Sequence, residues 1–439
     1  MKKILITFSF VLAVAVSAAK AQQDSVWTLE KCIQYALDKN IQVRKGELSN
    51  QQNVLTADQY RMQRLMSVSA SLSQNFNWAK STSSGSSALT GSNGSSYSLN
   101  SGITIFNGFR LNNQISQADL NIEAGKLALQ TTEESISLSI LNAYLQVLYA
   151  EELVKNSEKQ IEASQSQLNL AAERMATQLI SRSDYAQVKS QLASEELTLA
   201  SAKSQLAIDK ISLEQLMELP VTDNFTLAHP DLSGNINQNR TPDIKSIYEK
   251  SLGIKPQIKN AALNKQVAAL DEKIAKAGLY PTLSASAGVS SSRSSNGSDN
   301  YFGQINNDIR PSAGFSLSIP IYQRNQVRTN VANAKIGYQN AELSEIDTKN
   351  QLRKNIEQAC QDVVSAQIKY EASLENYKST LESSELSNEK FLQGMLNSTD
   401  YLVSKTNLIV AESELLQSKF NLIFSYKILD FYSGVPLTL

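Results

Sequence analysis

The sequence repeats its own pattern at an offset of 216 residues. A heptad series of one tyrosine and four leucines occurs in each half: Tyr185, Leu192, Leu199, Leu206 and Leu213, then Tyr401, Leu408, Leu415, Leu422 and Leu429. Residues 103–107 match residues 319–323 at the same offset. Because separate segments agree at one offset, the chain is predicted to contain one structural unit twice.

The N-terminus resembles an export signal. Lys2 and Lys3 precede an apolar run, and Ala19-Lys20-Ala21 follows it as a small-x-small cleavage motif. Residues 1–21 are therefore predicted to be a signal peptide. No later stretch approaches the roughly 20 apolar residues that a membrane-spanning helix needs. Any membrane insertion is therefore expected to use strands.

Each half is predicted to consist largely of long helices. In the first repeat, residues 22–219, apolar spacing predicts a helix over residues 27–64, roughly 55 Å long. A second helix is predicted over residues 110–176, followed by a break at residues 177–179 and the first heptad helix.

The second repeat, residues 243–439, is expected to follow the same order. Residues 220–242 contain three prolines and no helical period, which predicts a linker between the repeats. After the linker, helices are predicted over residues 243–278 and 324–391, then a break at Gly394 and the second heptad helix.

Between the helices the pattern changes to period two, which predicts strands with one apolar and one polar face. The strands are predicted at residues 67–78, 97–107, 281–290 and 312–322, with polar loops at residues 81–96 and 291–311. Each strand is about ten residues long and free of charge, as in strands of outer-membrane barrels. A soluble β-sandwich could use the same alternation. Four strands cannot close a barrel, so a barrel would require several chains.

No pattern predicts catalysis. The net charge is −1, so the chain does not have the excess of basic residues that is typical of a nucleic-acid-binding protein. His229 is the only histidine, and the sequence has no CxxC, HExxH or phosphate-binding glycine motif, so no enzyme, metal site or cofactor is predicted. Cys32 and Cys360 could pair in an oxidising compartment, but two packed thiols are expected.

The element order and three motifs resemble the TolC-like outer-membrane efflux family. The motifs are Trp27-Thr28-Leu29-Glu30, Ile105-Phe106-Asn107-Gly108 and Ile319-Pro320-Ile321-Tyr322. The resemblance implies a mostly α fold with membrane β, assembled as a homotrimer in which a 12-stranded β-barrel among outer-membrane lipid stands on a 12-helix periplasmic tunnel.

The resemblance also implies a role. The tunnel would dock on a periplasmic adaptor (membrane fusion) protein and serve an inner-membrane transporter of RND or ABC type, in a tripartite efflux or type I secretion system. The protein would lie in the outer membrane and extend into the periplasm. The alternative is a secreted coiled-coil stalk or adhesin with no channel.

The family's tunnel tip has two corners, which match residues 174–185 and 391–401. Asp400 matches an aspartate ring that narrows the entrance and favours cations, and Asp184 matches a residue that helps hold the tip closed. Capping is the alternative role, because Ser181-x-x-Asp184 and Asn397-x-x-Asp400 each place an acid at the third helical position.

The sequence departs from the family at the tip. Leu396 and Phe391 stand where the closing arginine and tyrosine are expected. The candidates for tip closure are Arg174, Arg182, Tyr185, Phe391 and Tyr401. The candidates for adaptor contact are Gln178, Leu179, Gly394 and Met395. Gly394-Met395 keeps the family's glycine and apolar pair, whereas Gln178-Leu179 does not, so adaptor choice is expected to differ.

Overall fold

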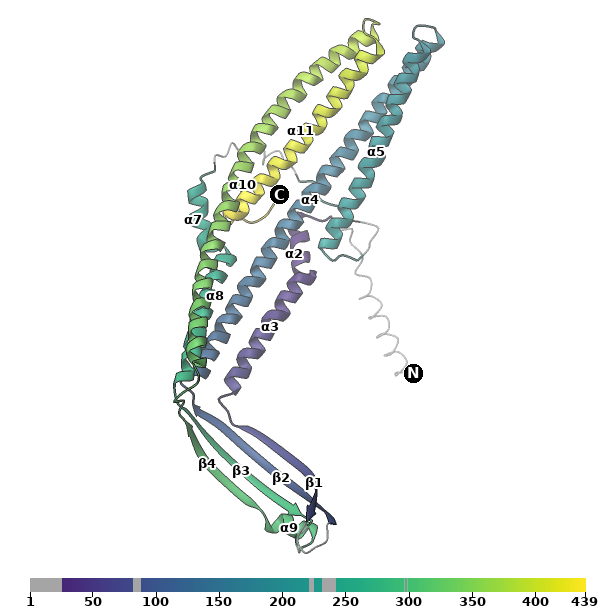
Figure 1. Cartoon of the computed structure of the whole chain (residues 1–439). Coiled ribbons are helices and arrows are strands. Elements are labelled where there is room, and N and C mark those ends of the chain that lie inside the picture. Colours follow the sequence, from purple (N-terminus) through teal and green to yellow (C-terminus); the bar gives the residue numbers. More distant parts are fainter. Residues whose placement is uncertain (1–25, 82–87, 221–224, 231–241, 296, 298) are drawn as a thin grey trace, which may run out of the picture. The chain divides into compact units, whose positions relative to one another are not determined.

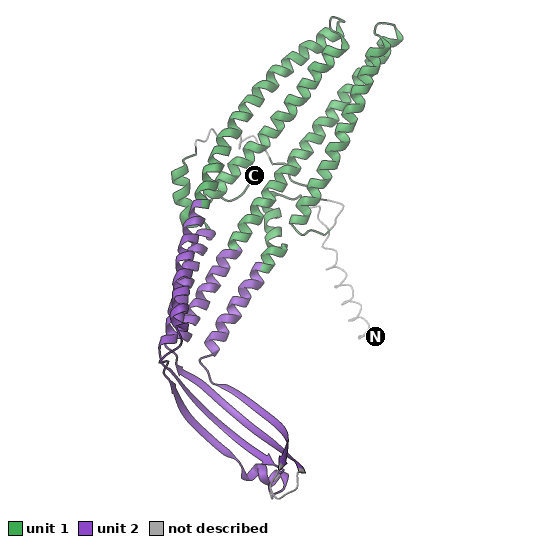
Figure 2. Ribbon diagram, in the orientation of Figure 1, with its two compact units in different colours: residues 1–45, 130–255, 351–439 green, residues 46–129, 256–350 purple. Residues whose placement is uncertain are grey.

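The computed structural model describes residues 26–81, 88–220, 225–230, 242–295, 297 and 299–439. The predicted signal peptide lies outside these residues. The chain divides into two compact units (Figure 2): unit 1 comprises residues 1–45, 130–255 and 351–439, and unit 2 comprises residues 46–129 and 256–350. Among the described residues, the helices are too short or too polar to cross a bilayer.

The two repeats build one sheet together in unit 2. The sheet is antiparallel with the order β1 (Ser67–Ser81), β2 (Ala88–Phe106), β3 (Thr282–Ser294) and β4 (Arg310–Ser318), as Figure 1 shows. Strand β2 of the first repeat pairs with β3 of the second, which leaves β1 and β4 at the edges. The predicted fold class, mostly helical with a small number of strands, is confirmed.

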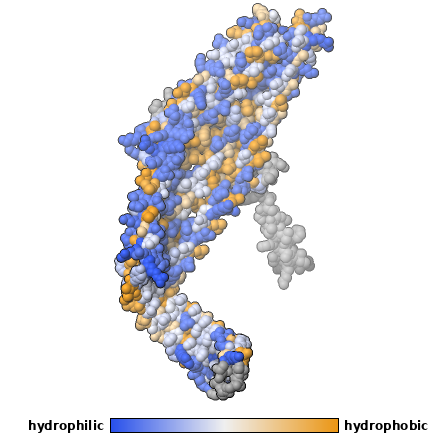
Figure 3. Space-filling model, viewed as in Figure 1, coloured by the Kyte–Doolittle hydropathy of each residue, from blue (hydrophilic) through white to orange (hydrophobic). Residues whose placement is uncertain are grey.

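The two faces of the sheet differ in chemistry. On one face, serine hydroxyls pair across β1 and β2, with 2.6 Å between the oxygens of Ser71 and Ser98. On the other face, the rings of Phe76 and Trp78 stack with centroids 6.4 Å apart, and Leu72 is exposed. In Figure 3 the visible surface of the sheet is mostly pale, the colour of residues with intermediate hydropathy. The predicted alternation is therefore present along the strands.

The predicted strand bounds are partly wrong. Strand β2 begins at Ala88, inside the segment predicted as loop, because serine and glycine residues there still form the cross-strand ladder. The second predicted loop contains a short helix, α9 (Tyr301–Asn307). The strands are also not free of charge, since Lys80, Arg293 and Arg310 lie at their loop ends. Strand β4 ends at Ser318 because Pro320 lacks a backbone donor.

Two helices predicted as continuous are each broken in two. The first repeat has α2 (Leu29–Lys39) and α3 (Ile41–Met62), separated at Asn40. The side-chain oxygen of Asn40 accepts a 2.8 Å hydrogen bond from the backbone amide of Gln42, and its Nδ2 donates a 2.9 Å hydrogen bond to the carbonyl of Leu216. The second has α7 (Ile244–Ile254) and α8 (Pro256–Lys276), followed by the 3₁₀ helix η1 (Ala277–Leu279). Proline disfavours helical backbone at the preceding Lys255, which ends α7.

The remaining helices confirm the duplication. Helices α4 (Arg110–Ala176) and α10 (Gln326–Leu392) have bounds separated by 216 residues, as do α5 (Arg182–Leu216) and α11 (Ser398–Tyr432). The residues with positive φ also fall into pairs at this offset: Gly108 and Arg324, Phe109 and Asn325, Gln178 and Gly394, and Glu218 and Gly434. The repeats therefore share their backbone bends even where the residue type differs.

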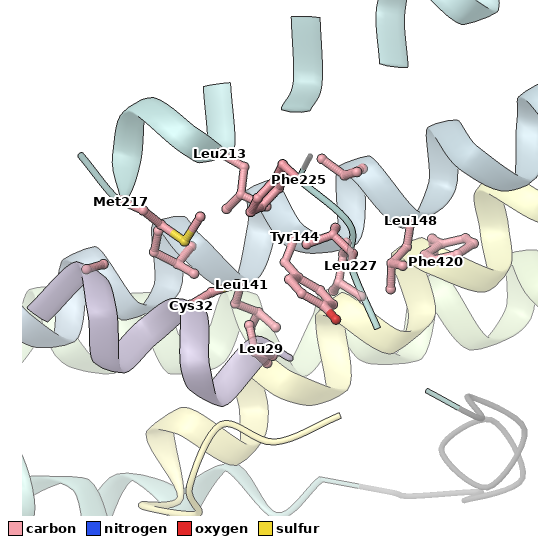
Figure 4. Close-up of a cluster of buried hydrophobic side chains, with 14 of the residues drawn as sticks. Leu29, Cys32, Leu141, Tyr144, Leu148, Leu213, Met217, Phe225, Leu227 and Phe420 are labelled. Carbon is pink, nitrogen blue, oxygen red and sulfur yellow. The ribbon is translucent and has the colours of Figure 1, made fainter. Parts of the chain in front are cut away.

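The core of unit 1 joins parts of the chain that are far apart in sequence. Figure 4 shows Leu29, Tyr144, Leu213 and Phe420 in one buried cluster, contributed by α2, α4, α5 and α11. The hydroxyl of Tyr144 donates a 2.8 Å hydrogen bond to the carbonyl of Ala228. The described part of the predicted linker, residues 225–230, therefore packs into this core.

The two cysteines are free and buried, as expected. Cys32 is fully enclosed within the core cluster, and Cys360 lies on α10. Burial raises the pKa of the Cys32 thiol to about 12, and the nearby carboxylate of Glu30 raises it further. Burial also raises the pKa of Cys360. Both residues are packed thiols of low reactivity.

Candidate functional site

The two predicted corners of the tip both lie in unit 1, where α4 turns into α5 and α10 turns into α11. Each long helix ends on a left-handed residue, Gln178 at φ 60° and Gly394 at φ 74°. In both corners the next amide donates a 2.8 Å hydrogen bond back to the helix, from Leu179 to Arg174 and from Met395 to Lys390. This is the backbone pattern of a glycine C-cap.

Because only Gly394 has the residue type that this backbone prefers, the corners are expected to respond differently to substitution. Gln178→Gly should raise the free energy of unfolding, and Gly394→Ala should lower it, each by about 1 kcal/mol. No atom lies within 4 Å of an added Cβ at Gly394, so only backbone strain contributes there. Denaturant titration of the two variants measures both effects, and changes of the same sign would contradict this account.

Both candidate carboxylates cap the helix that follows the corner. Ser181 and Asp184 form a reciprocal capping box at the start of α5. The hydroxyl and backbone amide of Ser181 donate to Asp184, which lowers the pKa of that carboxyl. At the start of α11, the amide group of Asn397 donates a 2.8 Å hydrogen bond to Asp400, and the backbone N–H of Asp400 donates to Asn397 Oδ1 at 2.8 Å. Capping therefore occurs at both corners.

Three of the five closure candidates come together across the two corners. Arg174 of α4 donates hydrogen bonds to the carbonyls of Phe391 at 3.3 Å and Leu392 at 2.8 Å, at the end of α10. Its guanidinium also lies 5.8 Å from the centre of the Phe391 ring. The Phe391 ring stacks on Tyr401 with centroids 4.6 Å apart. The cation therefore meets the last carbonyls of a helix C-terminus, where positive charge is stabilising.

The other two candidates do not join this cluster. The side chains of Arg182 and Tyr185 make no hydrogen bond or ion pair within the described part of the chain. Of the four residues predicted to contact an adaptor, Leu179 and Met395 have side chains that are 75% and 68% exposed. An open cleft of about 690 Å³ separates the corners and is lined by Arg174, Gln178, Asp184, Phe391 and Gly394, among others.

A buried polar cluster, Ser164, Glu195 and Lys405, links the two helix pairs behind the corners. Lys405 Nζ lies 3.2 Å from the Glu195 carboxylate, and both side chains are only 8% exposed. The Ser164 hydroxyl accepts a hydrogen bond from Lys405 and donates one to Glu195. Burial lowers the pKa of Lys405, while the Glu195 carboxylate opposes this effect.

A second buried contact lies beside this cluster. Gln167 of α4 donates a hydrogen bond to the hydroxyl of Tyr401 on α11. Burial raises the pKa of Tyr401 to about 12, and the charge on Glu195 adds to the shift. Together with Arg174, these contacts tie the α4–α5 pair to the α10–α11 pair.

The sequence prediction missed the buried cluster. A usable signal was present, because Glu195 lies three residues after Leu192 and Lys405 lies four after Tyr401. Both charges therefore fall on the helix face of the heptad series, where apolar residues are expected. The cluster is also not duplicated. At the offset of 216, Glu195 corresponds to Ala411, and Lys405 corresponds to the exposed Lys189.

Known proteins share both the sequence pattern and the fold. A family model described as outer membrane efflux protein matches residues 32–218 and 247–434. TolC of Escherichia coli strain K12 is 23% identical over 309 residues, which are 66% of this chain and span 60% of TolC.

Solved structures agree over nearly the whole chain. CusC superposes with a TM-score of 0.80 at 16% identity, covering 95% of this chain and 96% of CusC. The CmeC outer membrane channel of Campylobacter jejuni gives a TM-score of 0.77 at 16% identity, covering 92% of this chain and 85% of CmeC. The structural likenesses show the same fold, and the family match includes both repeats. The chain belongs to the outer membrane efflux protein family.

Proposed function

We propose that this protein is a passive outer-membrane channel that works as a homotrimer. The observation that carries this proposal is the sheet with one polar face, one apolar face and two free edges. Exposed edges are normally paired or covered, and four strands are too few to close a barrel. Three copies supply twelve strands, with β4 of one copy beside β1 of the next. The apolar face then meets lipid and the polar face lines water.

The helices form the periplasmic part of the channel in this proposal, as twelve helices around a tunnel. Substrates diffuse through it without catalysis, and an inner-membrane transporter of RND or ABC type supplies the energy. The corners dock on a periplasmic adaptor protein. The exposed apolar side chains of Leu179 and Met395 support this role, because the buried core of a protein interface is more apolar than the rest of the surface.

The narrow point for ions is proposed to lie at the corners. On the polar face of the described strands, Arg310 is the only charged residue, so the strands add little field to the lumen. Asp184 and Asp400 each occur three times in a trimer, and six carboxylates around one axis would attract cations. Capping and selectivity are compatible, since a capping carboxylate remains charged.

Membrane fractionation and bilayer recordings test the proposed function together. The mature protein should be recovered from outer membranes as a trimer and should conduct ions in planar bilayers. Asp400→Asn should lower the preference for cations, measured as the reversal potential in a salt gradient. Recovery as a soluble protein without conductance would support the secreted stalk or adhesin instead. An unchanged reversal potential would remove Asp400 from selectivity.

A further inference from the structure

Four arginines lie in unit 2 where the strands meet the helices. Arg64 precedes β1, Arg110 begins α4, and Arg324 and Arg328 lie at the start of α10. Because the strands are antiparallel, the start of β1 and the ends of β2 and β4 lie at the same end of the sheet. None of the four pairs with an acidic residue in the described ranges, and all are exposed. We call them the junction arginines.

Large apolar and aromatic side chains lie at the same level. Ile321 and Tyr322 follow β4 with exposed fractions of 96% and 82%, and Phe109 follows β2 with 62% exposed. Figure 3 shows orange, hydrophobic atoms where the strands join the helices. Unpaired cations beside exposed apolar groups are suited to an amphiphile with an anionic head. The cations attract the head, and the apolar groups contact its hydrocarbon chains.

Arg324 occupies a position where arginine is costly. Its φ is +49°, and the corresponding residue of the first repeat is Gly108, at φ +68°. A residue with a Cβ in left-handed backbone costs roughly 1 kcal/mol more than glycine there. Backbone strain of this kind clusters at functional sites, although the fold also holds Phe109, Gln178, Glu218 and Asn325 at positive φ. At this position the second repeat therefore has a cation in place of the glycine that the backbone favours.

An open cleft of about 920 Å³ brings this cation beside a second one. Arg110 and Arg324 both line it, together with Tyr322 and the carboxylate of Asp271. Asp271 is already bonded, since its Oδ1 accepts a 2.6 Å hydrogen bond from Gln117. Two guanidinium groups, each with several unused donors, remain available to oxygen atoms of a phosphate.

We propose that the junction arginines bind the phosphate headgroup of an anionic phospholipid in the periplasm-facing leaflet. The acyl chains lie along Phe109, Ile321 and the apolar face of the sheet. The inference rests on the proposed function, which places the sheet in the outer membrane. A lipid fits better than a soluble phosphate ion, because only a lipid would also cover the exposed apolar side chains.

The test compares lipid binding by the purified full-length protein and its variants in neutral detergent. Phosphatidylglycerol and the zwitterionic phosphatidylcholine are titrated separately, and bound lipid is counted by native mass spectrometry. Wild type should bind phosphatidylglycerol more tightly. Arg110→Gln and Arg324→Gly should each weaken that binding about fivefold, and the double variant about thirtyfold, at about 1 kcal/mol for each arginine.

Arg324→Gly separates binding from folding. It restores the residue type of the first repeat, so the variant should unfold at the same or a higher denaturant concentration while binding less lipid. Arg353→Gln is the matched control, because Arg353 is an exposed arginine of α10 that pairs with Glu357 outside unit 2. It should leave lipid binding unchanged.

Three results would overturn the inference. They are equal binding of both lipids by wild type, unchanged binding by the double variant, and full competition by inorganic phosphate, which would indicate an anion site without a lipid. Bilayer conductance distinguishes a failure of the proposed lipid site from a failure of the proposed channel. A double variant that conducts normally, beside a wild type without lipid preference, would refute only the lipid site. Absence of conductance in wild type would refute the channel.

Discussion

Lys405→Met is expected to destabilise the folded protein by about 3 to 5 kcal/mol, the usual cost of leaving one member of a buried ion pair unpaired. The substitution would leave the Glu195 carboxylate enclosed among α4, α5 and α11, with the Ser164 hydroxyl and the amide of Gln191 as its remaining hydrogen-bond donors. The midpoint of chemical denaturation of the purified protein measures the loss. Hydrogen exchange along α11 should show where the structure loosens.

The duplication supplies a matched control for this prediction. Lys189 corresponds to Lys405 at the offset of 216 but is exposed and makes no ion pair in the described residues, so Lys189→Met should change stability by at most about 0.5 kcal/mol. Replacing both charges, with Glu195→Leu and Lys405→Met together, should recover most of the loss because no charge remains buried. Equal losses for the two lysine variants would contradict a role for the buried pair.

In the proposed channel, Arg174→Ala is expected to open the tip. Removing the guanidinium takes away its hydrogen bonds to the carbonyls of Phe391 and Leu392 and the cation beside the Phe391 ring. Because the side chain is partly exposed, the loss should be about 1 to 2 kcal/mol, which raises the ratio of open to closed channels roughly 5- to 30-fold. The open fraction in single-channel recordings measures this shift.

Lys390→Ala is the control for Arg174→Ala. Lys390 holds the corresponding place at the end of α10, but its side chain makes no hydrogen bond or ion pair across the corners in the described residues. Its loss should leave the open fraction unchanged. If Arg174→Ala also leaves it unchanged, the hydrogen bonds across the corners are structural only. An equal rise in both variants would indicate a general effect of positive charge.

The long helices and the duplication could be predicted from sequence because their signals are local. Heptad spacing recurs within each helix. The absence of proline between Arg110 and Ala176 is compatible with one uninterrupted helix over that segment. The capping motifs at Asp184 and Asp400 are also local, since each lies three residues after its partner. The positions of the two turns between the helices could therefore be predicted without the contacts between the corners.

Several of the features that were missed depend on contacts between distant residues. At the break after α2, the side chain of Asn40 bonds to the carbonyl of Leu216, which lies 176 residues later in the chain. The extension of β2 into a predicted loop depends on the partner strand, because Ser96 has no apolar alternation to mark it. The contact of Arg174 with Phe391 joins the two repeats. A pattern along one helix does not contain these partners.

The enclosure of both native thiols has a practical consequence. Cys32 and Cys360 are buried and have raised pKa values, so maleimide and thiosulfonate reagents should leave them unmodified in the folded protein. A single cysteine introduced at Ser98 or at Leu99 would then be the only labelled position. These neighbouring positions sit on opposite faces of one strand. The natural chain is therefore already a suitable background for mapping, residue by residue, which side of the sheet meets water.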